Sequence, residues 1–356
     1  MKGKKCLMVG AYPKVPIFGG FVRDCEMLKL SNLYIDYEVI EFDSSQRSNP
    51  PPKLPIRMFF AVFRIIRLFK VILTNKFSVA VILFPSGLGA WEKICLGLFL
   101  NYTQPHVKIL FLPRAGRWID EVGNYPKFVQ RQFSDPHIFW LCQGNASQNA
   151  LRTANPHCKT YLLGPLVATE RSFTPRTNNY ENGLRFLYVG WLEESKGVLD
   201  LLAALKLTTE KFQLDIVGNG SLQQQVANAE KSDSRIVFHG WKSRDEVYAL
   251  YDTSHCLILP SYIEGFPNTV AEAMMHNCAV VVSDVGDVSG IIDSDQLTNS
   301  GCPEQLAHQI NLLTRNPNIV SKRCAYNLQR SKLFGVHGFN RILDELGLGD
   351  SGKFHI

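Results

Sequence analysis

Two glutamates stand eight positions apart, at Glu264 and Glu272, in a setting that favours ligand binding. The apolar run 257–259 is typical of a buried strand, and the string PSYIEGFP at 260–267 leads from it into a helix of small residues. On the second helical turn, Glu272 could accept two hydrogen bonds from a vicinal diol such as a ribose. Glu264, in the loop before the helix, would contact a more distant part of the same ligand. The spacing of the two glutamates alone is weak evidence for a ligand site, because ordinary helices often carry two surface acids. The whole string from strand to helix is more specific for such a site.

The start of this helix predicts an anion site. Pro267 suits the first helical turn, where its missing N–H would be unpaired in any case. The free amides of Asn268, Thr269 and Val270 would then point out of the helix start. Together with the helix dipole they suit a diphosphate, and Gly265 would let a ligand approach the backbone closely.

Eleven apolar runs alternate with helix-like segments, which is typical of parallel α/β sheets. They lie at 5–11, 37–42, 79–84, 108–112, 138–142, 159–163, 184–189, 213–217, 235–238, 255–259 and 279–283. A polar stretch at 166–183 separates them into two sets, so we expect two Rossmann-like, doubly wound domains. Helices are expected at 303–315 and 320–346. Ligands of such sheets bind outside the carboxyl ends of the strands, where the motifs above fall.

Composition limits the class of protein. The 356 residues are 46% apolar, which suits globular cores and is too little for a polytopic membrane protein. Nine single cysteines without metal-ligand spacing indicate buried thiols in a reducing cytoplasm, and no signal region is expected at the N-terminus. Residues 1–165 carry 21 Lys and Arg against 10 Asp and Glu, or +11, and the remainder carry 17 against 22, or −5. The basic half indicates either an anionic partner or a solvated basic face.

The segment Glu264–Glu272 resembles the Glu-x7-Glu signature of the retaining glycosyltransferases of family 4. Further strings resemble that family in the expected order: LYVGWLEESKG at 187–197, LDIVGNGS at 214–221, VFHGW at 237–241 and VVVSDVG at 280–286. The resemblance implies the α/β fold called GT-B, with two Rossmann-like domains facing each other across a cleft. Residues 1–165 would be the acceptor-side domain and 166–330 the donor-binding domain. Residues 331–356 would cross back to the first domain.

The resemblance implies roles at the matching positions. Glu272 would bind the ribose hydroxyls, Glu264 would contact the transferred sugar, and Lys196 would neutralise the diphosphate. Gly19 and Gly20, the main anchor of the weaker resemblance in the first half, would pack against the phosphates and sugar. The other implied donor contacts are Gly190, Gly218, Gly265, Phe266, Pro267, Asn268, Thr269 and Val270, with Trp241 and Lys242 at the nucleobase. A fixed cation and helix-start amides would stabilise the leaving diphosphate without a metal.

Two positions depart from the family pattern. The family has Gly-Arg where this chain has Gly190 and Trp191, and a tryptophan supplies no charge to the diphosphate. Many members have a histidine after the fourth strand of the first domain, whereas this chain has PRAG at 113–116. Three arginines are candidates for a compensating or acceptor-side contact: Arg23, Arg114 and Arg117.

Segment 55–73 combines a high apolar content with Arg57, Arg64, Arg67 and Lys70. A spanning helix would bury these charges at roughly 2.5–3.5 kcal/mol each near the bilayer centre, so we reject a membrane span. Two alternatives stay open. The segment is either an interfacial helix with its basic residues at the lipid headgroups, or a core helix of the first domain with its basic side in water.

The function implied by the resemblance is a retaining, metal-independent transfer of a hexose or N-acetylhexosamine from a nucleotide-diphosphate sugar, a UDP-sugar being favoured. No cofactor and no nucleic acid are expected. The acceptor would be a glycan or lipid-linked glycan of cell-surface polysaccharide or lipopolysaccharide biosynthesis. The protein would be cytoplasmic, with peripheral contact at the inner membrane face left open. Three alternatives remain: a nucleotide-sugar 2-epimerase of the same fold, a non-catalytic nucleotide-sugar-binding relative, and a lipid-surface adaptor.

Overall fold

The structure is a computed structural model that describes residues 3–12, 20–45, 54–114, 117–167 and 183–349. Side chains are described for these residues except at 54–58 and 117. The expected phosphate contact Gly19 lies outside the described residues. By their contacts, the described residues form two compact units, one up to residue 167 and again from 334, the other at 183–333.

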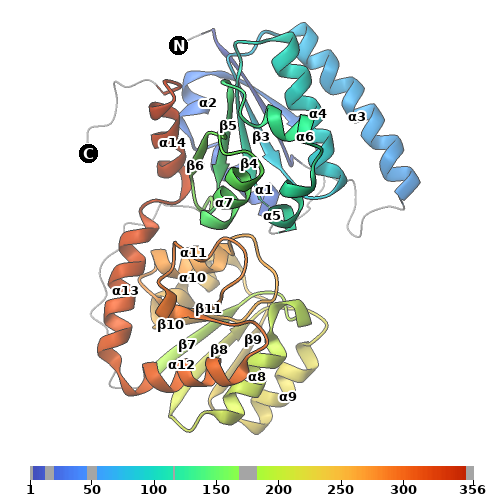
Figure 1. Cartoon of the computed structure of the whole chain (residues 1–356). Coiled ribbons are helices and arrows are strands. Elements are labelled where there is room, and N and C mark those ends of the chain that lie inside the picture. Colours follow the sequence, from blue (N-terminus) through green and yellow to red (C-terminus); the bar gives the residue numbers. More distant parts are fainter. Residues whose placement is uncertain (1–2, 13–19, 46–53, 115–116, 168–182, 350–356) are drawn as a thin grey trace. The chain divides into compact units, whose positions relative to one another are not determined.

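The first unit contains a parallel six-stranded sheet in the order β2-β1-β3-β4-β5-β6 (Figure 1). Its strands are β1 (Lys5–Gly10), β2 (Glu38–Asp43), β3 (Val79–Phe84), β4 (Lys108–Pro113), β5 (Ile138–Cys142) and β6 (Thr160–Leu162). Strands β3 and β5 are buried along their whole length, as expected where helices cover both faces. The strand order reverses between β1 and β3, so the topological switch point of this sheet lies at the carboxyl ends of these two strands.

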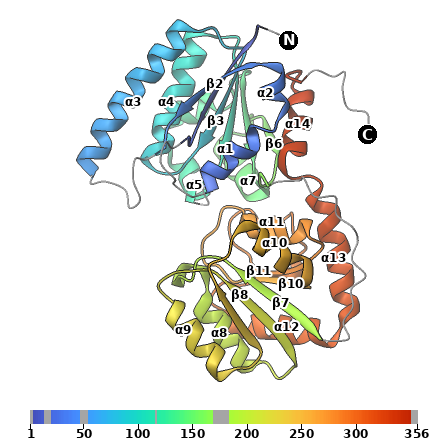
Figure 2. The same ribbon diagram turned by 180° about the vertical axis from the view of Figure 1, so that it is seen from behind.

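Helices cover both faces of the first sheet. One face carries α3 (Leu54–Thr74), α4 (Leu88–Thr103), α5 (Arg117–Glu121), η1 (Val122–Asn124), α6 (Lys127–Gln132) and α7 (Asn145–Ala154). The other face, visible in Figure 2, carries α1 (Gly20–Leu28), α2 (Asn32–Asp36) and α14 (Gly335–Glu345). Aromatic rings fill the core of the first face, where Phe111 and Trp118 stack on Trp140 with centroids 4.7 and 5.6 Å away.

Helix α14 belongs to the first unit although it lies near the end of the chain. Its Phe339 is fully buried in the core of the second face, and Asn340 Oδ1 accepts a hydrogen bond from Asn32 N at 3.0 Å. The expected helical stretch 320–346 is in fact two helices, α13 (Pro317–Ser331) and α14. The chain turns between them because Gly335 adopts a left-handed φ of 71° and its amide donates to Pro165 O at 2.9 Å.

The second unit contains another parallel six-stranded sheet, in the order β12-β11-β10-β7-β8-β9. Its strands are β7 (Leu184–Val189), β8 (Phe212–Val217), β9 (Ile236–Gly240), β10 (Cys256–Leu259), β11 (Ala279–Ser283) and β12 (Leu297–Thr298). Counted from β7, this is the Rossmann order 3-2-1-4-5-6, with its switch point between β7 and β10. The fold-class prediction is confirmed, since all eleven predicted strands are present with bounds within two residues. The two-residue strand β12 was not predicted.

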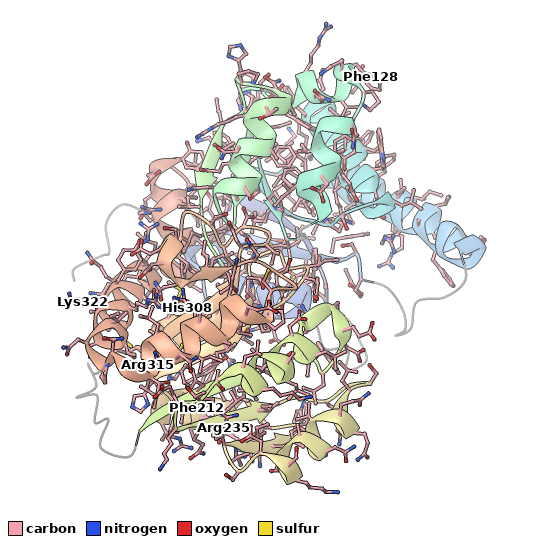
Figure 3. All side chains as sticks on the ribbon, turned by 60° about the horizontal axis from the view of Figure 1, so that its bottom comes forward. Phe128, Phe212, Arg235, His308, Arg315 and Lys322 are labelled. Atoms are coloured by element: carbon pink, nitrogen blue, oxygen red, sulfur yellow. The ribbon has the colours of Figure 1, made fainter. Side chains whose placement is uncertain are left out.

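Helices also flank the second sheet. They are η2 (Glu194–Lys196), α8 (Val198–Leu207), α9 (Gln223–Ser232), α10 (Arg244–Thr253), α11 (Asn268–Met275), η3 (Ser294–Gln296), α12 (Pro303–Arg315) and α13. At the amino end of β9, Arg235 lies over the ring of Phe212 at 4.9 Å and donates to Leu205 O at 2.7 Å, which ties the sheet to the end of α8 (Figure 3). Within the described ranges, no helix is long and apolar enough to cross a membrane.

Candidate functional site

Lys196 and Glu264 meet at the switch point of the second sheet. Lys196 ends η2 after β7, and Glu264 lies in the loop after the neighbouring strand β10. The Lys196 ammonium donates a hydrogen bond to Glu264 Oε1 at 2.7 Å, and both side chains are partly exposed. The sequence predicted both residues as separate ligand contacts. The structure brings them together as an ion pair at the edge of the sheet where ligands of this fold bind.

Backbone contacts hold the two loops that carry this pair. Gly197, directly after Lys196, has a φ of 66°, and a Cβ on it would lie 1.9 Å from Pro260 O. The amide of Tyr262 donates to Ser195 O at 2.9 Å across the same junction. Only glycine fits at position 197 without displacing the loop that carries Glu264, so this residue fixes the separation of the pair.

A third loop, after β11, supports the glutamate from its other side. Gly286 has a φ of 64°, and a Cβ on it would lie 2.3 Å from the carbonyl oxygens of both Glu264 and Gly265. The Asp287 amide donates to Gly265 O at 2.7 Å. The predicted string VVVSDVG therefore contributes a packing surface for the glutamate loop.

The loop after β8 packs against the loop after β7. Gly218 has a φ of 155°, and a Cβ there would lie 1.9 Å from Gly190 O. The Glu193 carboxylate accepts hydrogen bonds from Ser221 Oγ at 2.6 Å and Ser221 N at 3.0 Å, and these bonds lower the pKa of Glu193. The close approach of the backbones explains the glycine at 218. Its expected contact with a nucleotide stays a prediction.

The start of α11 differs in one detail from the predicted anion site. Pro267 is the N-cap residue rather than part of the first turn, and its carbonyl accepts from Ala271 N at 3.3 Å and Val270 N at 3.1 Å. Val270 N therefore already donates within the chain, because the first turn is tight. Asn268 and Thr269 precede the first helical hydrogen bond, and their amides are the donors that this helix start offers to an anion.

Glu272 is buried on α11 and is positioned by a residue that the sequence did not single out. Tyr251, on the neighbouring helix α10, donates to Thr269 O at 3.1 Å and lies 3.3 Å from Glu272 Oε2. Behind it, the ring of His276 packs 5.4 Å from that of Tyr251, and His276 Nδ1 lies 2.6 Å from Asp252 Oδ1. Tyr251 carried no signal in the sequence, because it occupies an ordinary buried position of an amphipathic helix.

The predicted nucleobase contacts lie after β9. Trp241 is largely exposed, while Lys242 pairs with Glu246 at 3.0 Å within the capping box of α10. After β7, Trp191 is also exposed, and its carbonyl accepts from Tyr188 Oη at 2.9 Å. Burial, and then the nearby negative charge of Glu264, raise the pKa of the Tyr188 hydroxyl, so this group stays a hydrogen-bond donor. The Phe266 side chain is buried, and the donor contact expected of its backbone amide stays a prediction.

The first-unit candidates occupy different settings. Gly20 opens α1 after β1, next to the switch point of that sheet, and Arg117 opens α5. Arg114 is buried after β4, with Nε 3.4 Å from Asp24 Oδ2 and Nη1 donating to Gly164 O at 3.1 Å. Burial raises the pKa of Asp24, although the charges of Arg114 and then Arg23 act in the opposite direction. Arg114 therefore has a structural role within its own unit, and an acceptor role for any of these arginines stays a prediction.

The described residues contain no group of three or more His, Cys, Asp or Glu side chains that could hold a metal ion. The sequence has one Asp-x-Asp string, at 293–295, but Asp295 pairs with Arg323 at 3.1 Å.

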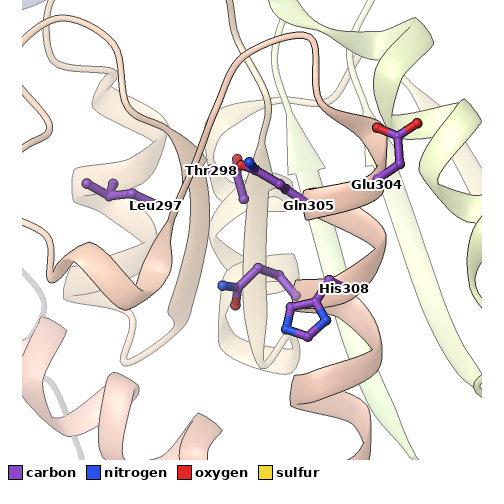
Figure 4. A pocket seen from close by; sticks show the side chains of 6 residues that line it. Leu297, Thr298, Glu304, Gln305 and His308 are labelled. Atoms are coloured by element: carbon purple, nitrogen blue, oxygen red, sulfur yellow. The ribbon is translucent and has the colours of Figure 1, made fainter.

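A hollow of about 350 Å³ lies beside β12 and α12 and contains none of the predicted site residues (Figure 4). Its lining residues are Leu297, Thr298, Glu304, Gln305, His308 and Gln309. Two of them are already engaged, since Gln305 Oε1 accepts from Asn299 N at 2.8 Å and Gln309 Nε2 donates to Asp295 O at 3.0 Å.

Comparison with known proteins gives this geometry a family context. Residues 183–316 match the family of glycosyl transferases group 1. The chain is 36% identical over 106 residues to the lipopolysaccharide 1,6-galactosyltransferase of Salmonella typhimurium, covering 28% of this chain and 30% of that protein. It is 31% identical over 240 residues to the glycogen synthase of Mycobacterium tuberculosis, covering 62% and 56%. Both matches span less than two thirds of the relative's length.

Solved structures resemble nearly the whole chain at low sequence identity. Sucrose-phosphate synthase from Thermosynechococcus elongatus has a TM-score of 0.72 at 15% identity, covering 97% of this chain and 98% of its own. The lipopolysaccharide outer core galactosyltransferase WaaB has a TM-score of 0.71 at 15% identity, covering 97% and 99%. The Anabaena protein HepE, in complex with UDP, has a TM-score of 0.70 at 15% identity, covering 96% and 99%. The chain therefore has the GT-B fold of these structures, and its second unit matches the group 1 glycosyl transferases.

Proposed function

We propose that this protein is a glycosyltransferase that moves a hexose or N-acetylhexosamine from a nucleotide-diphosphate sugar to a glycan or lipid-linked acceptor. The observation that carries the proposal is the Lys196–Glu264 pair at the switch point of the second sheet, inside the segment that matches group 1 glycosyl transferases. Two further features support it. The α11 start offers amides beside this pair, and Glu272 lies buried on the next turn.

In the proposed donor complex, each of these side chains and amides would contact a different part of the nucleotide sugar. Lys196 and the amides of Asn268 and Thr269 would hold the diphosphate and stabilise the charge that develops when it leaves. Glu264 would contact the hydroxyls of the transferred sugar, and Glu272, oriented by Tyr251, would bind the ribose. A UDP-sugar is the favoured donor, since UDP is the nucleotide bound by the structurally similar HepE.

The reaction would retain the configuration of the sugar and need no metal. The bond from the anomeric carbon to the diphosphate oxygen would break as the acceptor oxygen attacks from the same face. The acceptor proton would pass to the leaving phosphate oxygen, so the scheme needs no protein nucleophile. Relatives named for lipopolysaccharide galactosyl transfer support a cell-surface glycan as the acceptor, with the chemistry in the cytoplasm.

A thermal-shift screen of the full chain against UDP, GDP, ADP and their sugars tests the donor. Ligand at 100 times its Kd should stabilise the folded protein by about 2.7 kcal/mol, and we expect UDP or a UDP-sugar to do so. Lys196→Ala should lose most of this stabilisation, whereas Lys206→Ala, an exposed lysine on α8, should keep it. Stabilisation by no nucleotide sugar would overturn the proposal. Conversion of the donor sugar without an acceptor would indicate the epimerase instead.

A further inference from the structure

Helix α3 exposes an apolar stripe that the proposed sugar transfer does not use. Five large side chains on one side of the helix are 54–68% exposed: Phe59, Val62, Phe63, Ile66 and Leu73. Their spacing of three, four and seven residues places them on one helical face, while Leu68 and Ile72 on the opposite side are buried in the core. Contiguous exposed apolar side chains of this kind mark an interaction surface.

Helix α4 continues this surface. Leu88, Trp91, Cys95 and Tyr102 repeat along one side of α4, with Leu88 65% and Tyr102 88% exposed, while Ile94 faces the core. Both helices cover the same face of the first sheet, and α3 lies alongside α4 at the outside of the unit in both views (Figures 1 and 2). We call these two exposed stripes together the α3–α4 face.

Two side-chain contacts hold α3 against α4. The rings of Phe69 and Phe99 stack with centroids 4.0 Å apart. The Arg64 guanidinium donates two hydrogen bonds to the Glu92 carboxylate, at 2.6 and 3.0 Å. The apolar stripes are therefore held beside each other by packing and by a two-point ion pair.

The charges in the sequence of α3, α4 and the loop between them are almost all positive. Residues 54–103 contain six Lys and Arg and one acid, Glu92, which gives a formal charge of +5. Glu92 is itself largely buried, between Arg64 and Lys93, so its charge is compensated within the unit. Lys70 is exposed on the apolar stripe itself, between Ile66 and Leu73, and Arg67 is exposed beside the stripe. An apolar stripe with exposed cations complements the headgroups and acyl boundary of an anionic bilayer.

We propose that the α3–α4 face binds the surface of an anionic lipid bilayer. The apolar side chains would enter the headgroup–acyl boundary, while Arg67 and Lys70 extend along the surface to lipid phosphates. A second copy of the chain is the less suitable occupant, because a two-fold contact would set this cationic face against itself. The proposal is independent of sugar transfer, since it concerns a surface of the first unit alone.

Vesicle co-sedimentation of the full chain tests the proposal without any nucleotide sugar. We expect the protein to sediment with phosphatidylcholine vesicles that contain phosphatidylglycerol, and much less with pure phosphatidylcholine. Ile66→Glu should weaken this binding by roughly tenfold or more, because an anion replaces an apolar side chain that would enter the bilayer. Replacing both Arg67 and Lys70 by Gln should weaken it by about fivefold for each charge.

Ile35→Glu is the matched control, because Ile35 is 79% exposed on α2, on the opposite face of the same sheet. It should bind vesicles as the wild type does. Tyr102→Glu gives a second variant, on α4, in case Ile66→Glu lowers the melting temperature. Failure of the wild type to prefer anionic vesicles would overturn the proposal, as would equal losses for Ile66→Glu and Ile35→Glu. So would dimerisation that Ile66→Glu abolishes without any vesicle binding by the wild type.

Discussion

Replacement of Gly197 by alanine tests whether the contact between two loops determines the geometry of the proposed donor site. The Cβ of Gly197→Ala would lie 1.9 Å from Pro260 O, whereas such contacts require at least 3.0 Å, so the carbonyl must move by about 1.1 Å. That movement would loosen the hydrogen bond from Tyr262 N to Ser195 O. It would also shift Glu264, four residues after Pro260, relative to Lys196.

The expected magnitude has two parts. Alanine in the left-handed region costs about 1 kcal/mol by itself. Loss of the Tyr262 hydrogen bond and displacement of the loop add about 1–2 kcal/mol. Gly347→Ala provides the control, because Gly347 has a φ of 64° against 66° at Gly197 and its Cβ would meet nothing within 4 Å. Gly347→Ala should therefore lose only the stability that alanine costs in the left-handed region, about 1 kcal/mol.

Thermal unfolding and calorimetry with UDP separate the two variants. Gly197→Ala should melt about 2–8 °C below Gly347→Ala, at about 2–4 °C per kcal/mol for a unit of this size. It should also bind UDP at least tenfold more weakly and lose roughly 100-fold in turnover, since a shift of about 1 Å disrupts a positioned site. Gly347→Ala should bind UDP as the wild type does. Equal melting temperatures and equal UDP affinities for the two variants would refute the reasoning.

Four further predictions address the proposed donor site, the reaction and a buried ion pair of the first unit. Glu272→Ala should weaken UDP binding by tenfold or more, as two charge-assisted hydrogen bonds are lost; unchanged affinity in calorimetry would remove the ribose role. Glu264→Gln should reduce turnover more than donor affinity, and wild-type turnover would exclude Glu264 from the reaction. Activity should persist in excess EDTA, whereas complete loss restored by Mg²⁺ would contradict the metal-free scheme. Glu92→Gln should lower the unfolding free energy by about 3 kcal/mol, because Lys93 is left buried without its partner. Burial acts to raise the Glu92 pKa, but Arg64 and Lys93 hold it below its ordinary 4.5. The wild type should therefore lose this stabilisation as the pH falls below 4.5, and denaturant titrations of Glu92→Gln should lack that part of the acid dependence.

The strands of the fold were predictable because a strand that is buried on both faces of its sheet has a continuous apolar sequence. Strand β3 (Val79–Phe84) is apolar at every position, since helices cover both sides of it. The glycines at 197, 218 and 286 could be located by their motif strings. The structural reason for each glycine could not be predicted, because each one packs against a backbone carbonyl from another loop.

Pairings between distant residues were the part that the sequence did not predict. Lys196 and Glu264 are 68 positions apart, and they meet only because β7 and β10 are neighbours in the sheet. Tyr251 supports Glu272 from an adjacent helix by a contact that depends on helix packing. Arg114 was considered for a ligand contact, and its burial against Asp24 follows from packing in the first unit rather than from any local pattern.

The Lys196–Glu264 pair offers a physical link between the two halves of the proposed donor. Without a ligand each charge satisfies the other, so neither is left uncompensated in a partly buried site. A diphosphate would compete with Glu264 for the lysine, and the carboxylate, once released, could accept hydrogen bonds from the sugar hydroxyls. Because the Trp191 side chain supplies no cation, Lys196 would carry more of this exchange. Under this scheme diphosphate binding and sugar contact depend on a single ion pair, and the glycine at 197 matters because it holds that pair in reach.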